Sequence, residues 1–139
     1  MSFTEETRAL TDAAILTLLD AGCAKAGEMG QPQCLVIVDA SGVELGVMRM
    51  RGAKYLALKS ARAKAQTAAS TGAQSAKIPE GVRVAIGQAT GGAMTGLVGG
   101  LPIRMAGTLV GGVGVGSGSG AQDIEVAEAM LTAIGADPA

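Results

Sequence analysis

Residues 107–123 read GTLVGGVGVGSGSGAQD, with glycine at about every second position. The first half, Thr108–Val115, alternates glycine with branched side chains, which is typical of a strand that packs closely against its neighbours. Behind it, Asp123–Ile134 carries apolar residues at helical spacing, and Asp123 and Glu125 lie where acids favour the positive end of a helix dipole. The stretch therefore predicts a closing strand, a glycine turn and a final helix.

The turn itself also fits the GxGxxG/A pattern of dinucleotide sites, through Gly116, Gly118 and Ala121. That site needs a further strand about 20 residues on, whose acidic residue holds the ribose. Only eighteen residues follow Ala121, and the predicted helix takes most of them. We therefore expect no nucleotide here. Two roles stay open for the turn: a plain connection, or an anion site made of backbone amides.

Two hairpins are expected outward from this stretch. Leu101–Met105 precedes the glycine-rich strand across a tight Ala106-Gly107 turn. Cys34–Asp39 is nearly continuous in apolarity, as a central strand would be, and a short turn returns the chain as Val43–Met50. Strands joined by short turns are antiparallel, so the predicted fold class is α+β rather than a repeated βαβ unit.

Helices are expected between and around the hairpins. A capping-box pattern at Ser2–Glu5 precedes apolar residues at helical spacing, which predicts a helix over residues 4–26. A narrow alanine stripe predicts a second helix over Lys54–Ala69. Residues 70–98 are the least legible, with a short helix expected over 79–88 and a loop or strand edge over 90–100.

Composition limits the class of protein and its partners. The 139 residues are 48% hydrophobic and 17% charged, which suits one domain, residues 1–139. A net charge of −1 and only two aromatic residues, Phe3 and Tyr55, argue against nucleic acid. No run of about 18 apolar residues spans a membrane, and no apolar leader is visible. Cys23 and Cys34 are expected to be small buried hydrophobes of a cytoplasmic protein.

Charged residues are segregated along the chain, and histidine is absent. The missing histidine removes the commonest general base and the commonest metal ligand, so we expect no bound metal. No acid lies between Glu44 and Glu80, whereas seven of the eleven basic residues do: Arg49, Arg51, Lys54, Lys59, Arg62, Lys64 and Lys77. This run indicates either a solvated helix face or the mouth of an anion-binding pocket.

The second interpretation predicts a cofactor-independent enzyme of a catabolic pathway that moves a proton on an anionic organic substrate, as an isomerase, hydratase or lyase does. Lys64 and Tyr55 are the catalytic candidates, because a desolvated lysine can titrate near neutrality. Substrate would be bound by three guanidinium groups and three turn residues: Arg49, Arg51, Arg62, Gly116, Ser117 and Gly118. The turn amides would stabilise developing negative charge as an oxyanion hole does.

Five segments together resemble the GlcG/HbpS family, which also occurs at the C-terminal end of PduO-type proteins and is often labelled haem-degrading. They are VIVDASG (36–42), RMRGA (49–53), SARAKAQTAA (60–69), GGLPI (99–103) and LVGGVGVGSGSGAQDIEVAEAML (109–131). The resemblance implies a profilin-like fold with a five-stranded antiparallel sheet and packed helices. It also implies a homo-oligomer, from dimer to octamer. Arg51 departs from the family, which commonly has an acid there, and Gly116–Gly118 replaces a common Ser-Gly-Gly turn.

The resemblance implies an alternative function, a non-catalytic protein that binds haem or another tetrapyrrole. The basic segment would then meet the propionates. Without histidine, an iron ligand would be Tyr55, a cysteine, a methionine or a threonine such as Thr67. The methionines, Met48, Met50, Met94 and Met105, are interpreted either as fillers of a core without aromatics or as soft ligand contacts. No cofactor follows from the residues themselves, and haem follows only from the resemblance.

Overall fold

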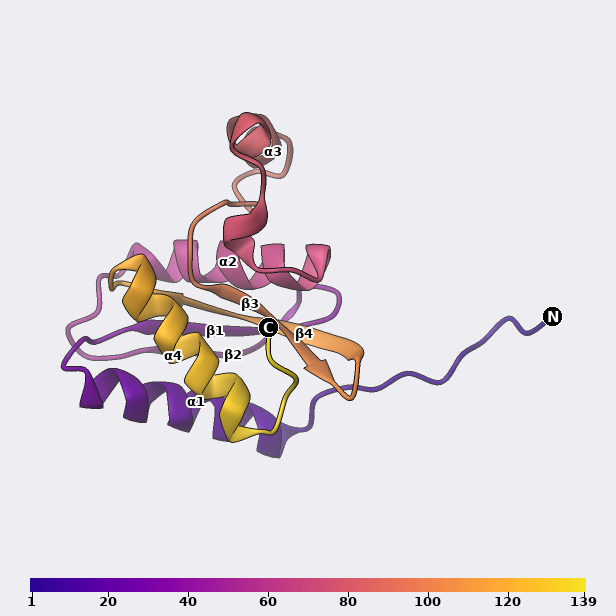
Figure 1. Ribbon diagram of the computed structural model, residues 1–139, viewed down its shortest axis with the longest axis horizontal. Helices are drawn as coiled ribbons and strands as arrows, with labels where there is room; N and C mark the ends of the chain where they lie inside the picture. Colours follow the sequence, from indigo (N-terminus) through magenta and orange to yellow (C-terminus); the bar gives the residue numbers. More distant parts are fainter.

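Four antiparallel strands form one sheet at the centre of the molecule (Figure 1). In a computed structural model that describes residues 1–139, they are β1 Cys34–Asp39, β2 Glu44–Arg49, β3 Gly100–Met105 and β4 Thr108–Gly116. Their order is β2-β1-β4-β3, so the two predicted hairpins meet where β1 pairs with β4. The α+β class and both hairpins are confirmed, whereas the expected count of five strands is wrong.

Residues 90–99, which lie before β3, explain the missing strand. They were expected to form a loop or a strand edge, and they form a loop. Side chains, not a neighbouring strand, satisfy part of its backbone: the Thr95 amide donates to Oγ1 of Thr67, and the Met94 amide donates to Oγ1 of Thr90. The loop is therefore bonded to the helix that contains Thr67 and does not pair with β3, which stays at the edge of the sheet.

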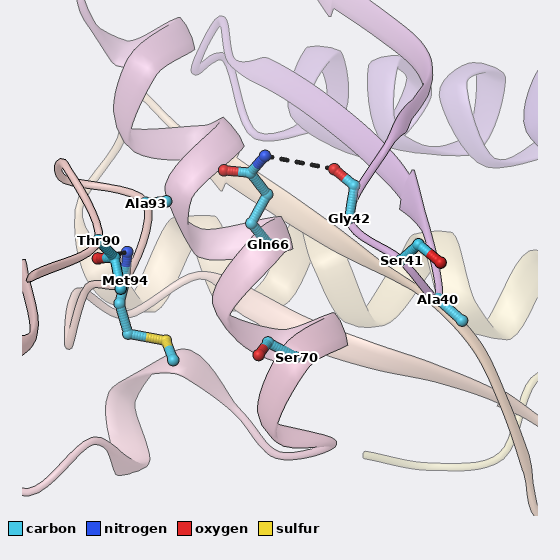
Figure 2. Close-up of a pocket in the computed structure, with 8 residues that line it drawn as sticks. All are labelled: Ala40, Ser41, Gly42, Gln66, Ser70, Thr90, Ala93 and Met94. Carbon is cyan, nitrogen blue, oxygen red and sulfur yellow. Dashed lines mark hydrogen bonds between the residues drawn. The ribbon is translucent and has the colours of Figure 1, made fainter.

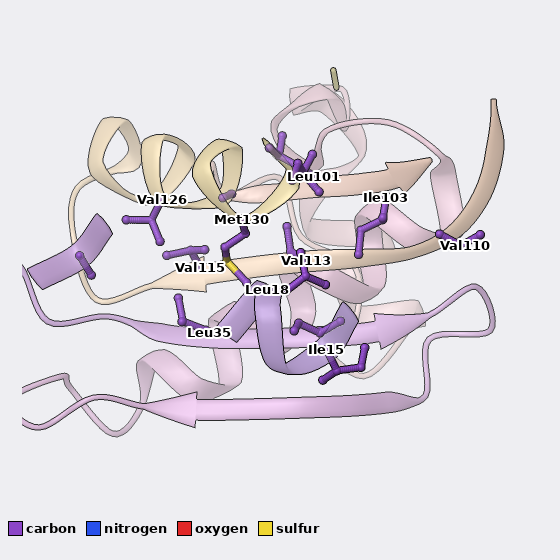
Figure 3. Close-up of a cluster of buried hydrophobic side chains, with 14 residues drawn as sticks. Ile15, Leu18, Leu35, Leu101, Ile103, Val110, Val113, Val115, Val126 and Met130 are labelled. Carbon is purple, nitrogen blue, oxygen red and sulfur yellow. The ribbon is translucent and has the colours of Figure 1, made fainter. Parts of the chain in front are cut away.

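Helices cover both faces of the sheet (Figure 1). α1 Asp12–Glu28 and α4 Gly120–Ala133 pack on one face, and α2 Ala57–Thr71 packs on the other. The first face holds a cluster of 14 buried apolar residues, where Leu18 of α1 and Met130 of α4 meet strand side chains (Figure 3). The second face holds a thinner cluster of eight, most of which are small: Cys34, Val36, Val38, Ala53, Ala57, Ala61, Ala65 and Ala69.

Alternate glycines of β4 let α2 lie directly on the sheet. A Cβ added at Gly112 would be 2.5 Å from the Ala65 carbonyl oxygen, and one at Gly116 would be 2.9 Å from that of Ala57. Gly114 lies closer still to the Ala61 carbonyl. The valines between them point to the opposite face and enter the larger core. Glycine and valine thus alternate because one face of β4 lies against the backbone of α2, whereas the other face packs against the side chains of the larger core.

The first residues of α1 and α4 differ from the predicted ones. α1 begins at Asp12, with Thr11 as N-cap, because Oγ1 of Thr11 accepts from the Ala14 amide at 3.1 Å. The expected start at residue 4 is wrong: residues 1–9 are exposed and no helix forms before residue 12. α4 begins at Gly120, three residues before its expected start, because Ser119 and Gln122 form a reciprocal capping box.

A small lobe stands out beyond α2 (Figure 1). It consists of two short 3-10 turns, Ser75–Lys77 and Glu80–Val82, followed by α3 Arg83–Ala89, close to the expected helix over 79–88. None of the residues of α3 is buried. Arg83 holds the lobe together by donating to the carbonyls of Ile78 and Ala76.

Nowhere in the chain is a helix both long and apolar enough to cross a membrane.

Candidate functional site

The outward face of α2 forms the floor of a groove. Ala61, Ala65 and Ala69 point to the sheet, so residues displaced around the helix point away from it. Four polar side chains recur there at three- and four-residue spacing: Lys59, Arg62, Gln66 and Ser70. Two adjoining cavities lie along this stripe and share Gln66 and Ala93 as lining residues.

The first cavity lies between the β1–β2 turn and the loop that follows α3 (Figure 2). Its volume is about 240 Å³, and eight residues line it: Ala40, Ser41, Gly42, Gln66, Ser70, Thr90, Ala93 and Met94. Gln66 donates to the Gly42 carbonyl at 3.3 Å, which fixes the turn against α2. On the opposite wall, the thioether of Met94 is the one soft donor atom of the cavity.

The second cavity, of about 480 Å³, continues the groove toward the start of α2. Lys59 and Arg62 line it from the helix, and Gly91, Gly92 and Thr95 line it from the loop. The loop is held in place from below, because Oγ1 of the buried Thr67 donates to the Ala93 carbonyl at 3.2 Å. The groove thus joins a cationic end to an end with a sulfur donor.

Arg62 is held at the groove by an acid from the edge strand. Its guanidinium pairs with the carboxylate of Glu44 at the start of β2. β2 carries a bulge, so that Gly46 pairs with Ile37 but Glu44 pairs with Val38, and Leu45 is the extra residue. The bulge returns Glu44 to the face of the sheet that α2 covers. Arg62 is the one predicted site residue that lines the groove.

Lys64, predicted as the acid or base, lies on the other side of α2. Its side chain is 5% exposed, and Nζ donates to Oδ2 of Asp123 at 3.0 Å and to the Val115 carbonyl at 2.7 Å. Because Asp123 belongs to α4, this buried ion pair joins helices on opposite faces of the sheet. Lys64 lines neither cavity of the groove, and its two partners account for its burial.

Two amides of the glycine turn, those of Gly118 and Ser119, bond to side chains within the protein. The Gly118 amide donates to Oδ1 of Asp123 at 3.1 Å, and the Ser119 amide donates to Oε1 of Gln122 at 2.9 Å. Ser117 has a φ of 93°, which is unusual for a residue with a side chain. Its Oγ accepts from the Lys54 amide at 2.9 Å, which holds this conformation. As they lie here, the amides of Gly118 and Ser119 do not point to a ligand, and Gly116 lies under α2.

The remaining predicted residues lie before α2, away from both cavities. Arg49 ends β2, and Arg51 and Tyr55 lie in the connection to α2; all three are exposed, Tyr55 at 71%. Tyr55 and Lys64 are therefore not brought together, since one is on the surface and the other in the interior. No group of three or more acidic, cysteine or histidine residues could hold a metal ion.

Three further features escaped prediction by role. Gln66 lines both cavities, and no sequence pattern predicted a role for it. Met94 was one of four methionines with two possible roles, as a core residue or as a ligand contact, and the sequence did not distinguish it from the others. Gln33 is fully buried beside the glycine turn, and neither its Oε1 nor its Nε2 has a hydrogen-bond partner.

Burial raises the pKa of the Cys34 thiol, whose Sγ donates to the Lys54 carbonyl, so Cys34 stays a buried thiol as expected.

Comparison with known proteins gives a family for this architecture. The model of the HbpS-like family, described as haem degrading protein HbpS-like, matches residues 10–132. The chain belongs to the HbpS-like family. The resemblance stated from the sequence is thereby confirmed. A comparison with proteins of curated function gives no significant match.

Solved structures of HbpS-like relatives share the fold over almost the whole chain. A haem complex of PduOC is 27% identical with a TM-score of 0.87, covering 94% of this chain and 98% of that one. Streptomyces reticuli HbpS, as a double mutant, is 28% identical with a TM-score of 0.82, covering 93% and 89%. Protein ORFY of Klebsiella pneumoniae is 24% identical with a TM-score of 0.92 over 99% of both chains, and indicates the fold alone.

Haem is the group that the HbpS-like family implies, and the groove offers suitable chemistry for it. Met94 supplies a soft sulfur that can ligate iron, and Lys59 and Arg62 supply cations for propionates. Other donors are engaged or displaced: Thr67 is buried and bonded to the loop, and Tyr55 lies outside both cavities. The residues of the groove therefore fit an anionic tetrapyrrole through Met94 rather than through Thr67 or Tyr55.

Proposed function

We propose that this chain binds haem or a related tetrapyrrole in the groove between α2 and residues 90–97. The observation that carries the proposal is the placement of a thioether and two cations along one pair of adjoining cavities. The haem complex of a relative that is 27% identical supports it. The larger cavity, of about 480 Å³, lies within the range of ordinary ligand sites, and the adjoining cavity adds about 240 Å³ to it.

Each end of the groove would have its own task. Lys59 and Arg62 would bind the propionates by charge-assisted hydrogen bonds, with Arg62 oriented by Glu44. Met94 would hold the iron, and the methyl groups of Ala63 and Ala93 would contact the macrocycle. Bound haem supplies one-electron and oxygen chemistry, and the part of the chain is to bind and orient it.

A hemin titration of the whole chain tests this proposal. We expect a saturable Soret shift at micromolar protein, and a changed iron spectrum with weaker binding in Met94→Leu, because leucine keeps the volume but lacks the sulfur. Met48→Leu is the matched control, since Met48 is 42% exposed on β2. Lys59→Gln/Arg62→Gln should weaken binding about tenfold, whereas Lys25→Gln on α1 should not. A titration without a Soret shift, or equal spectra for the two methionine variants, would contradict the assignment.

An enzyme for a small anionic substrate is the second candidate. The same cations that would pair with a propionate would pair with the carboxylate of an organic acid, and isomerase or lyase chemistry at Lys64 and Tyr55 stays a prediction. A thermal-shift screen of small carboxylic acids tests the binding step, because a ligand of the folded state raises the unfolding temperature. A rise that Lys59→Gln/Arg62→Gln abolishes supports this candidate. A screen without any rise contradicts this second candidate.

A further inference from the structure

The N-terminal arm, residues 2–8, lies apart from the body of the molecule (Figure 1). All of its residues are exposed, including Phe3, the single phenylalanine of the chain, at 90%. The arm is anchored only at its base, where Arg8 donates to the Met105 carbonyl at the tip of the β3–β4 hairpin, and where Leu10 packs against the core. The ring of Phe3 is exposed, and the side-chain bonds to the arm's backbone come from within the arm, between Ser2 and Thr4 and from Thr7 to Arg8. Near the base, residues 5–8 line a cavity with Thr108.

The arm also carries two acids without ionic partners. The salt bridges of the chain use Glu28, Glu44, Asp123 and Glu125, so Glu5 and Glu6 remain unpaired. Together with Phe3 they form a short acidic segment with an aromatic anchor. A second surface has the opposite character. Residues 49–56, here the basic connection, join β2 to α2.

The basic connection has three cations that form no salt bridge, Arg49, Arg51 and Lys54. Beside them, Tyr55 is 71% exposed and Leu56 is 60% exposed. Exposed apolar side chains within a set of unpaired charges are typical of a surface that binds another protein. Its charge and its apolar groups match those of the arm.

The arm cannot reach the basic connection of its own chain. The register pairs Arg49 with Cys34 and Cys34 with Gly116, so the basic connection lies at the Gly116 end of β4. The arm is anchored beyond the Thr108 end, about 26 Å away along the strand at 3.3 Å per residue. From Arg8 to Phe3 a fully extended chain spans at most about 18 Å. Any contact between the two must therefore join two molecules.

We propose that the N-terminal arm of one copy docks on the basic connection of a second copy. Phe3 packs against Tyr55 and Leu56, and Glu5 and Glu6 pair with Arg51 and Lys54. A buried aromatic anchor supplies affinity, and the charges supply register and specificity. Because arm and basic connection lie at opposite ends of the sheet, two copies lying antiparallel can exchange arms in a closed, symmetric pair. The proposal is independent of what the groove binds.

Charge exchange in the full-length chain tests the contact by sedimentation equilibrium at low salt. We expect Glu5→Lys/Glu6→Lys to weaken self-association about tenfold, and Arg51→Glu/Lys54→Glu to do the same, because each places like charges together. The four changes combined should restore association to within about threefold of the unmodified chain. Phe3→Ala should also weaken association without changing its dependence on salt.

Asp20→Lys/Glu128→Lys is the matched control, since it makes the same change in net charge at exposed positions of α1 and α4. It should leave self-association unchanged. The arm variants change only exposed residues, so their circular dichroism and thermal unfolding should match those of the unmodified chain. A chain that is monomeric up to about 100 μM, where a specific interface would be populated, overturns the proposal. The proposal is also overturned if neither charge reversal weakens self-association, or if the combined variant does not restore it.

Discussion

At the scale of single residues, the glycines of β4 set the distance between α2 and the sheet, because they have no side chain. Gly112, Gly114 and Gly116 each face a backbone carbonyl of α2, so no other residue fits without moving the helix. The same face buries Lys64, which reaches past the sheet to Asp123. Close backbone packing and one buried ion pair therefore act at the same layer boundary.

Gly114→Ala tests the close packing. The added methyl group would collide with the Ala61 carbonyl, and because that group is helix backbone it cannot move alone. We expect a loss of about 3 kcal/mol in the free energy of unfolding, at the upper end for overpacked cores. Gly27→Ala, on an exposed turn of α1 with nothing within 4 Å, should instead gain up to about 1 kcal/mol. Urea denaturation measures both, and equal stabilities would contradict the packing argument.

Lys64→Met tests whether the buried pair is structural. Removing the ammonium leaves the carboxylate of Asp123 buried with only the Gly118 amide as partner, which should cost about 3–5 kcal/mol. Lys64→Met/Asp123→Asn should recover at least half of that loss, because a neutral amide oxygen still accepts from Gly118. Urea denaturation of the single and double variants measures this. A cost below about 1 kcal/mol for Lys64→Met would show that the pair does not hold the layers together.

At the scale of elements, local patterns and tertiary contacts predicted different parts of the fold. The strand Cys34–Asp39 was predicted with its observed bounds, since a continuous apolar run is itself the consequence of burial on both faces. The capping-box pattern at Ser2–Glu5 misled, because Thr11 offers a cap directly before the residues that reach the core. The groove could not be predicted, because its wall is set by long-range bonds from Thr67 that no spacing reveals.

The lobe around α3 is the element that we expect to open most readily. α3 has seven residues and none of them is buried, and its first turn has no side-chain cap, so its helix is stabilised mainly by Arg83 and by Thr90 at its C-terminal end. Hydrogen-exchange mass spectrometry should show residues 80–92 exchanging about a thousandfold faster than β1 and β4, whose amides open only with the whole molecule. Hemin should slow exchange in residues 90–97 if the groove binds it. Uniform protection across α3 and β1 would contradict this order of stability.

At the scale of the whole molecule, the side chains of both proposed binding surfaces lie outside the two buried clusters that form the core. The groove lies on the outer face of α2, and the N-terminal arm and the basic connection lie at opposite ends of the sheet (Figure 1). The predicted site combined residues of the groove, the basic connection, the glycine turn and the interior, because a basic run in sequence was taken as one surface. In the fold this basic run divides into a buried pair at Lys64, the groove cations Lys59 and Arg62, the unpaired cations of residues 49–54, and Lys77 in the lobe.

The pH dependence of stability should depend on two thiols, that of the buried Cys34 and that of the half-buried Cys23. Burial raises the pKa of Cys34 above its ordinary 9.0, with Arg49 lowering it and Asp123 raising it to lesser extents. Burial, and then Asp20, raise the pKa of Cys23 in the same direction. A raised value means that the unfolded chain loses these protons first. Their contribution to stability is therefore complete below about pH 9 and is lost as the pH rises through the native values.

Cys23→Ala/Cys34→Ala removes this linkage and leaves every other titratable group of the chain in place. The free energy of unfolding, measured by urea denaturation between about pH 8 and pH 10, should fall less steeply in this variant than in the unmodified chain. The slope, not the absolute stability, is the readout, because Cys34→Ala also leaves a small cavity in β1. Parallel slopes would mean that the thiols ionise as readily in the folded protein as in the unfolded chain, which contradicts the effect of burial on their pKa values.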